Sequence, residues 1–286
     1  MEKQKGEATR TAAGTIALIQ HAGKCRNGCD WDSRATTPAP ANSRWNCNGH
    51  AVPFRLKNGA MNGGTILIVI VVAALVIAGA IYSAIAARKR REALFMLATR
   101  LGLNFDMSEN CDLANRFGFL KRLAQGDNRY AFNVLSGTYQ ENEVLVFDYH
   151  YETHSTDSKG NRQTAVHQFS FFILVLPAFF PDLTITREGW LTKIAEAFGF
   201  DDIHFESAEF SKAFCVRSKD KKFAYDVCNS SMMEYLLANR DLSIEIENQA
   251  LALAFNSCLS VEEIESNLQR LIQIRLRLPE YLFTKA

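Results

Sequence analysis

One uncharged apolar run constrains this chain more than any other feature. It extends from Thr65 to Ala87 and consists almost entirely of Ile, Val, Leu and Ala. As a helix, its roughly 23 residues span about 34 Å, which is enough to cross a hydrocarbon core of about 30 Å. Lipid offers no partner for backbone polar groups, so a helix is favoured here despite the many β-branched residues. The run therefore predicts a transmembrane helix.

The orientation of this helix follows from its flanks. Four consecutive cations come directly after the apolar run: Arg88, Lys89, Arg90 and Arg91. Positive charge is retained on the cytoplasmic side, so we expect a single pass through the bacterial inner (cytoplasmic) membrane with the N-terminus outside. The same cations are the expected membrane-surface residues, since each is worth about 1 kcal/mol near anionic headgroups. A cleaved signal peptide is the alternative, because Ala84–Ala87 contains small residues typical of a cleavage site.

The chain after the span is long enough for a domain with a core of its own. The full chain has 286 residues. Residues 61–91 are expected to form the anchor and its basic flank, which leaves residues 92–286 for one cytoplasmic domain. That region contains 19 Lys and Arg but 27 Asp and Glu, a net charge of −8. Nucleic-acid phosphates favour clustered cations, so nucleic acid is not an expected partner. We expect the lipid bilayer and a protein of unknown identity instead.

Residues 1–60 differ in character from the rest. Gly, Asn, Thr, Ala and Arg dominate, and no apolar periodicity persists, so we expect either disorder or an over-extended reading frame. Met61 directly precedes the span and is the expected natural start. A structural zinc site is a weaker alternative, because four residues fall near zinc-ligand spacing but little apolar material surrounds them. These are Cys25, Cys29, Cys47 and His50.

Beyond the anchor, the apolar pattern alternates between helix and strand periods. The helix is expected to continue to Leu101 and to end at Gly102, with a second helix over residues 113–123. Residues 129–139 and 143–153 have a period of two and predict a hairpin. Residues 164–176 predict a central strand that ends at the prolines 177 and 181. A short strand over residues 183–186 and a helix over residues 189–198 should follow.

The C-terminal third shows the same mixture. Short strands are expected at residues 201–206 and 214–217, and helices at 220–228 and 231–239. Residues 242–248 and 250–256 predict a second hairpin. Ser260 and Glu263 form a capping box that begins a last helix. The fold class is therefore α+β, with an N-terminal transmembrane helix followed by a mostly antiparallel sheet with packed helices.

Several stretches carry a resemblance. NVLSGTY, VFDYHYET, the apolar run ending in LP, KIAEAFGFDDIHFE and EFSKAF are similar to segments of a group of bacterial proteins with one membrane anchor and a cytoplasmic domain of unknown function. The resemblance covers residues 93–286. It implies an anchored bacterial protein and no particular chemistry.

One constellation could support chemistry. Asp148, His150, Glu152 and His154 alternate along a predicted strand and so share one face. Carboxylates and imidazoles together can bind a divalent ion or act as acid and base, with His167 and His204 as additional ligands. Alternate residues lie about 6.6 Å apart along a strand, which is long for sharing one ion. A solvated sheet face near a strand end is the simpler interpretation.

The remaining signals are weak. Asp201, Asp202, His204 and Glu206 form a second polar cluster that a solvated turn explains. The chain contains no P-loop, G-x-G-x-x-G, G-x-S-x-G, H-E-x-x-H or C-x-x-C motif. We therefore favour a membrane-anchored interaction or scaffold domain without catalytic, cofactor or metal residues. A lipid- or surface-sensing module, by analogy with pleckstrin-homology domains, and a metal-dependent enzyme are the alternatives.

Overall fold

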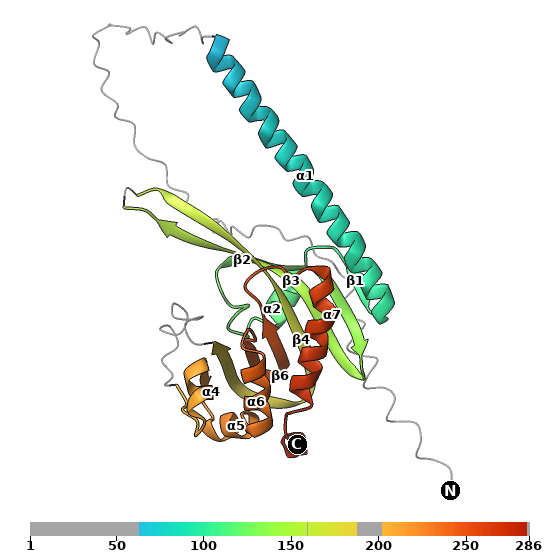
Figure 1. Cartoon of the computed structure of the whole chain (residues 1–286), viewed down its shortest axis with the longest axis vertical. Coiled ribbons are helices and arrows are strands. Elements are labelled where there is room, and N and C mark those ends of the chain that lie inside the picture. Colours follow the sequence, from blue (N-terminus) through green and yellow to red (C-terminus); the bar gives the residue numbers. More distant parts are fainter. Residues whose placement is uncertain (1–62, 159, 188–201, 285–286) are drawn as a thin grey trace, which may run out of the picture. The chain divides into compact units, whose positions relative to one another are not determined.

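The computed structural model describes residues 63–158, 160–187 and 202–284. Helix α1 (Gly63–Leu101) contains the predicted apolar run and continues beyond it without interruption (Figure 1). It is the one helix among the described residues that is long and apolar enough to cross a membrane, from Leu67 to Leu101, with a mean hydropathy of 2.8 in its most apolar stretch. The chain divides into two compact units between Lys89 and Arg90, inside this helix.

The last turns of α1 belong to the core of the second unit. Leu94, Leu97 and Ala98 are almost fully buried there. The helix ends at Gly102, which has a φ of +71°, and the Leu103 amide then donates to the Ala98 carbonyl at 2.8 Å. Glycine adopts this left-handed conformation without a Cβ clash, so the helix end is where the sequence predicts it.

Six antiparallel strands form one sheet (Figure 1). They run in the order β1-β2-β3-β4-β5, and β6 pairs with the other edge of β4. The strands are β1 (Asn104–Asp106), β2 (Asp127–Tyr139), β3 (Asn142–Thr156), β4 (Arg162–Arg187), β5 (Phe214–Ser218) and β6 (Ile244–Ala254). The outer ends of β3 and β4, from the pair Thr153 and Ala165 to the pair Thr156 and Arg162, form a ribbon that projects beyond β2.

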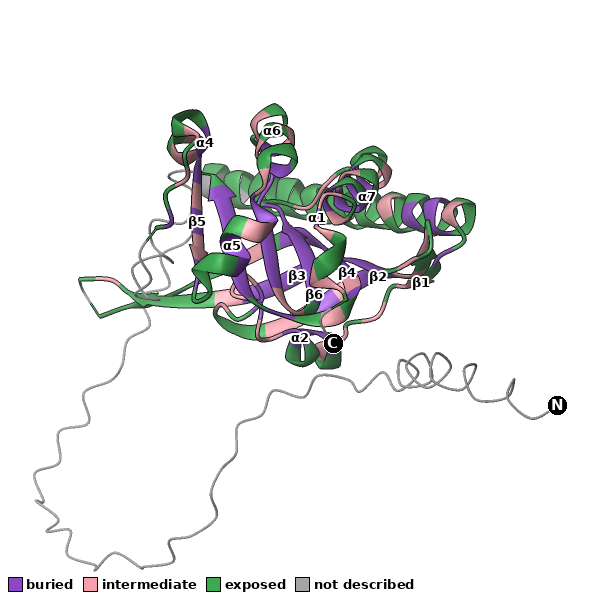
Figure 2. Ribbon diagram, turned by 90° about the horizontal axis from the view of Figure 1, so that it is seen from below, coloured by how far each residue is buried: buried purple, intermediate pink, exposed green. Residues whose placement is uncertain are grey.

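Both faces of the sheet are covered, which is why the middle of β3, β4 and β6 is buried (Figure 2). The larger core lies between one face and the end of α1 together with α4, α5, α6 and α7. The smaller core lies under α2 and the turns that follow it. These helices are α2 (Cys111–Arg116), α4 (Ala208–Ala213), α5 (Lys221–Val227), α6 (Ser230–Ala238) and α7 (Val261–Arg275), and a 3₁₀ turn at Glu280–Leu282 ends the chain's described part. The α+β prediction is confirmed.

The prediction that the central strand ends at Pro177 and Pro181 is wrong. β4 is a single strand of 26 residues that contains both Pro177 and Pro181. On one edge, β3 pairs with β4 as far as Leu174 and β5 begins to pair at Leu183, so both prolines lie in the gap between the two partners. On the other edge, the register with β6 shifts at Phe180. Proline lacks an amide hydrogen and is tolerated where the ladder is interrupted.

The predicted second hairpin is likewise one strand. Both halves of β6 pair with β4, from Ile244 to Asn248 and from Ala250 to Ala254. Asn248 has a φ of +53°, a left-handed conformation that Asn tolerates better than most residues. The polar pair Asn248-Gln249 therefore marks a bulge, in which the strand bends and continues.

Other expectations have mixed outcomes. The predicted helix over 113–123 is the shorter α2 followed by turns, and residues 202–207 contain no strand. Helix α4 was not predicted, although Ser207 caps it by accepting from the Phe210 amide at 3.2 Å. The capping box of Ser260 and Glu263 begins α7 as predicted. The helix expected at 189–198 and everything expected of residues 1–60 lie outside the described residues.

Candidate functional site

The predicted basic flank contains one residue with a different role. Arg90 is turned into the domain, where its guanidinium donates to both carboxylate oxygens of Asp148, at 3.1 and 3.0 Å, and to the Leu259 carbonyl. Asp148 also accepts from Asn133 at 3.0 Å and from Ser170 at 2.7 Å. One buried carboxylate thus connects α1, β2, β3, β4 and the loop before α7.

Burial makes this cluster energetically important. The side chain of Asp148 is 5% exposed and that of Arg90 is 25% exposed. Ser170 extends the network, because its hydroxyl also accepts from the Leu259 amide at 2.9 Å. Burial, together with the charge of Asp148, raises the pKa of the nearby Cys258 thiol to about 12. Removing one partner of a buried ion pair leaves the other charge uncompensated, which costs about 3–5 kcal/mol.

The other three cations of the basic flank remain on the surface. Arg88, Lys89 and Arg91 are exposed along α1. The expected membrane-surface role therefore stays a prediction for these three. It stays a prediction for Arg90 as well, although the guanidinium of Arg90 is paired with Asp148 inside the domain.

The row of alternating polar residues on β3 does not form the solvated face expected for it. Asp148 and His150 are 4% and 7% exposed, whereas Glu152 is half-buried and His154 is exposed. The interpretation as a solvated face is wrong for the first two, because the row begins beneath the end of α1 and reaches solvent only toward its end. His150 stacks on Tyr130, with ring centroids 4.5 Å apart.

Each of the other polar groups has a local partner. Glu152 accepts from Asn128 at 2.7 Å, and chiefly this bond holds the pKa of its carboxyl below the usual range. His154 bonds Thr164 across the ribbon at 2.9 Å. His167 bonds Thr153 and stacks on Tyr151, which places it on the opposite face from His150. Within the described ranges, no group of three or more His, Cys, Asp or Glu residues is arranged to hold a metal ion.

A second buried carboxylate lies near the other end of the sheet. Glu245 on β6 is 6% exposed and accepts from the Arg122 amide at 3.1 Å. Burial raises its pKa to about 7, against the opposing effect of that bond and of the charges on Lys121 and Arg122. Lys121 also contacts Thr184 at 3.1 Å and Asp182 at 3.5 Å. The turns after α2 are therefore attached to the sheet through charged groups as well as through apolar packing.

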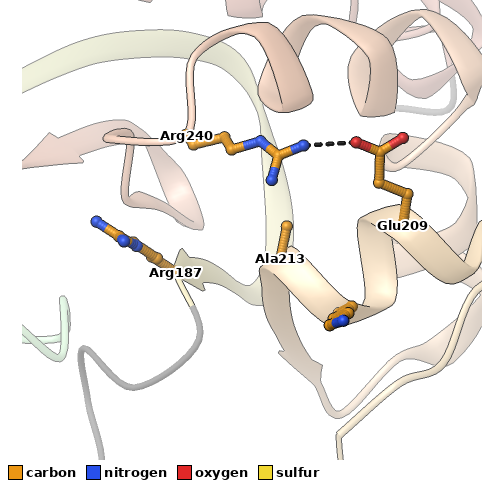
Figure 3. A pocket seen from close by; sticks show the side chains of 5 residues that line it. Arg187, Glu209, Ala213 and Arg240 are labelled. Atoms are coloured by element: carbon orange, nitrogen blue, oxygen red, sulfur yellow. Dashed lines mark hydrogen bonds and ion pairs between the residues drawn. The ribbon is translucent and has the colours of Figure 1, made fainter.

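One hollow lies beside α4. It has a volume of about 460 Å³ and is bordered by the end of β4, by α4 and by the turn after α6 (Figure 3). Arg240 extends across this region to an ion pair with Glu209. Its guanidinium also donates to the Leu237 carbonyl at 3.2 Å. The lining residues are Arg187, Glu209, Lys212, Ala213 and Arg240.

A smaller hollow of about 320 Å³ adjoins it and shares Lys212. Here Asp202 accepts from the Cys215 thiol at 3.0 Å and from Arg217 at 2.6 Å. Burial alone would raise the pKa of Asp202, but these bonds and the Arg217 charge outweigh it and hold the pKa below its usual range. His204, from the predicted second polar cluster, also borders this hollow. The cluster is therefore partly structured, whereas Asp201 lies outside the described residues.

Comparison with known proteins adds little. No family model and no curated protein sequence matches the chain. A crystal structure of the mycobacterial trehalose monomycolate transport factor A, TtfA, matches with a TM-score of 0.47 and 14% sequence identity, over 67% of this chain and 97% of that chain. A similarity at this level carries no argument about function.

Sequence reasoning did not find the two arginine-containing clusters. The alternation on the predicted strand indicates Asp148, but the run of cations predicts a membrane-surface role for its partner Arg90. Arg187, Lys212 and Arg240 are separated by more than twenty residues each and belong to no motif. Their proximity depends on how β4, α4 and α6 pack, which no local pattern records.

Proposed function

We propose that this protein is a single-pass membrane protein whose domain, from residue 92 onward, faces the cytoplasm and works as an interaction or scaffold module at the bilayer surface. The observation that carries this proposal is the continuity of α1. The apolar stretch and the buried residues Leu94, Leu97 and Ala98 belong to one helix without an intervening linker. The domain is therefore held within a few residues of the bilayer.

The basic flank supports the proposed orientation. Arg88, Lys89 and Arg91 are exposed directly after the apolar stretch, where cytoplasmic anionic headgroups would attract them. Arg90 makes its contribution inward, through Asp148. Three of the four cations thus lie on the exposed surface of α1, whereas Arg90 connects α1 to the sheet. A domain held in this way suits binding partners that also reside at the membrane.

Reporter fusions to the C-terminus of the full chain test the topology. A fluorescent protein should be fluorescent and alkaline phosphatase inactive, since the phosphatase needs the periplasm to form its disulfides. Fusions placed after residue 62 are not a suitable comparison for the C-terminal fusions, because the reporter would then lie before the span. An active C-terminal phosphatase would overturn the orientation and favour a cleaved signal sequence.

A matched pair of variants tests the anchoring. Replacing Lys89 and Arg91 by Glu should shift a fraction of the C-terminal fusions to the phosphatase-active orientation, because the charge asymmetry across the span is reduced. Replacing Arg275 and Arg277 by Glu changes the same total charge far from the span and should leave the topology unchanged. Equal behaviour of the two variants would contradict the role of the basic flank.

A further inference from the structure

The hollow beside α4 concentrates positive charge in an otherwise acidic domain. Three cations and one carboxylate line it, an excess of two positive charges, whereas residues 92–286 carry a net charge of −8. The cations come from three separate segments: Arg187 ends β4, Lys212 lies on α4, and Arg240 follows α6. Like charges repel, so gathering them at one place requires either nearby anions or an anionic ligand.

The three cations differ in how they are held. Arg240 is fixed at one end by Glu209 and at the other by the Leu237 carbonyl. The side chains of Arg187 and Lys212 have no hydrogen bond or ion pair with another residue in the part of the chain that the structure describes. Figure 3 shows Arg240 reaching to Glu209, with Arg187 set apart from this pair. Among the described residues, two cations are thus available to a ligand beside a third that is already positioned.

We propose that this hollow binds a phosphate group. Guanidinium groups present planar pairs of donors that match two oxygens of a phosphate, and a lysine ammonium adds a compact charge. A phosphate monoester carries close to two negative charges at neutral pH, which balances the excess of two positive charges. A carboxylate would leave one of them uncompensated. The volume of about 460 Å³ also leaves room for the group to which the phosphate is attached.

The test uses the full chain in detergent micelles, titrated with inorganic phosphate at constant ionic strength and followed by calorimetry. Arg187→Gln and Lys212→Gln should each weaken binding by at least about tenfold, because each removes a charge-assisted hydrogen bond to the phosphate. The matched control is Arg162→Gln, because Arg162 is an exposed arginine at the opposite end of the same strand. Its binding should equal that of the unmodified chain.

Glu209 supplies a test of opposite sign. Its carboxylate lines the hollow and would repel a bound anion, so Glu209→Gln should tighten phosphate binding by a few-fold at low salt. Weaker binding by this variant would overturn the proposal. So would an Arg162→Gln variant that weakens binding as much as Arg187→Gln, because binding would then follow net charge and not the hollow.

The phosphate could come from a lipid headgroup or from a soluble compound, and a second titration separates these sources. Dibutanoyl phosphatidic acid, a water-soluble lipid analogue, is compared with inorganic phosphate on the same variants. Tighter binding of the analogue identifies a headgroup, and equal or weaker binding identifies a soluble phosphate compound. No binding of either at about 10 mM, the weak end of specific recognition, would overturn the proposal without affecting the topology.

Discussion

The arginine beside Asp148 and the arginines beside α4 differ in what surrounds them. Arg90 meets a carboxylate that is 5% exposed and already accepts from Asn133 and Ser170. Arg240 meets Glu209 in an ion pair whose side chains are 54% and 67% exposed. In the first pair the carboxylate is enclosed by protein groups and the arginine is largely covered. The second is open to solvent on the side of the hollow.

This difference separates structural from binding roles of the same residue type. A buried charge must keep its partner, because water cannot replace it. An exposed ion pair contributes about 0–1 kcal/mol and can exchange its partner for a ligand at little cost. The buried cluster therefore stabilises the attachment of α1, whereas the exposed cluster is free to bind. Substitutions in these two pairs test this contrast, and one at Glu245 extends it to another buried carboxylate, from the largest expected effect to the smallest.

Asp148→Ala should have the largest effect, a loss of about 3–5 kcal/mol in the free energy of unfolding, because it leaves Arg90 without its carboxylate. Urea unfolding of the full chain in micelles, followed by circular dichroism, measures this. Asp241→Ala is the matched control, since Asp241 also forms a two-pronged pair with an arginine, Arg270, but its side chain is 62% exposed. The control should lose less than about 1 kcal/mol. Equal losses would contradict the role of burial.

Glu245→Gln should have an intermediate effect that depends on pH. The pKa of Glu245 is raised from 4.5 to about 7 on folding, so its stabilising contribution is complete below about pH 4.5 and is lost as the pH rises through about 7. The unmodified chain should therefore lose up to about 3 kcal/mol relative to the Gln variant between pH 5 and 8. Urea midpoints at several pH values measure this difference. A difference that does not change with pH would contradict the prediction.

Arg240→Gln should have the smallest effect on stability, below about 1 kcal/mol, because both partners of its ion pair are well exposed and salt screens them. Thermal unfolding at low and at moderate salt measures it, and the small loss should shrink further as salt rises. A loss above about 2 kcal/mol would show that Arg240 is a structural residue. The contrast with Arg90 would then disappear.

Much of the fold could be predicted from periodicity and local signals. The apolar run, the glycine that ends α1 and the capping box of α7 are local features, and the structure has each where it was expected. The errors occur where a residue typical of a strand end lies within a strand that continues because it pairs with a neighbouring strand. Pro177 and Asn248 both suggest an end, yet β4 and β6 continue past them because each strand finds a partner on the far side.

The candidate site could be predicted only in part. The alternation on β3 correctly places Asp148 and His150 on one face, but it cannot report that α1 covers this face. Burial of a polar residue depends on elements distant in sequence, as with Arg90, 58 residues from Asp148. No sequence signal indicates the cations beside α4. Each looks like an ordinary surface residue in the sequence, and only the fold brings the three together.

The length of β4 has a consequence for synthesis of the chain. Its partner β3 is made just before it, but β6, which pairs with its other edge, ends only at Ala254. At about 5–20 residues per second, this edge waits on the order of ten seconds for its partner. An unpaired strand edge invites pairing with other chains. During synthesis, the edge of β4 that pairs with β6 is therefore exposed to mispairing for longer than the edge that pairs with β3.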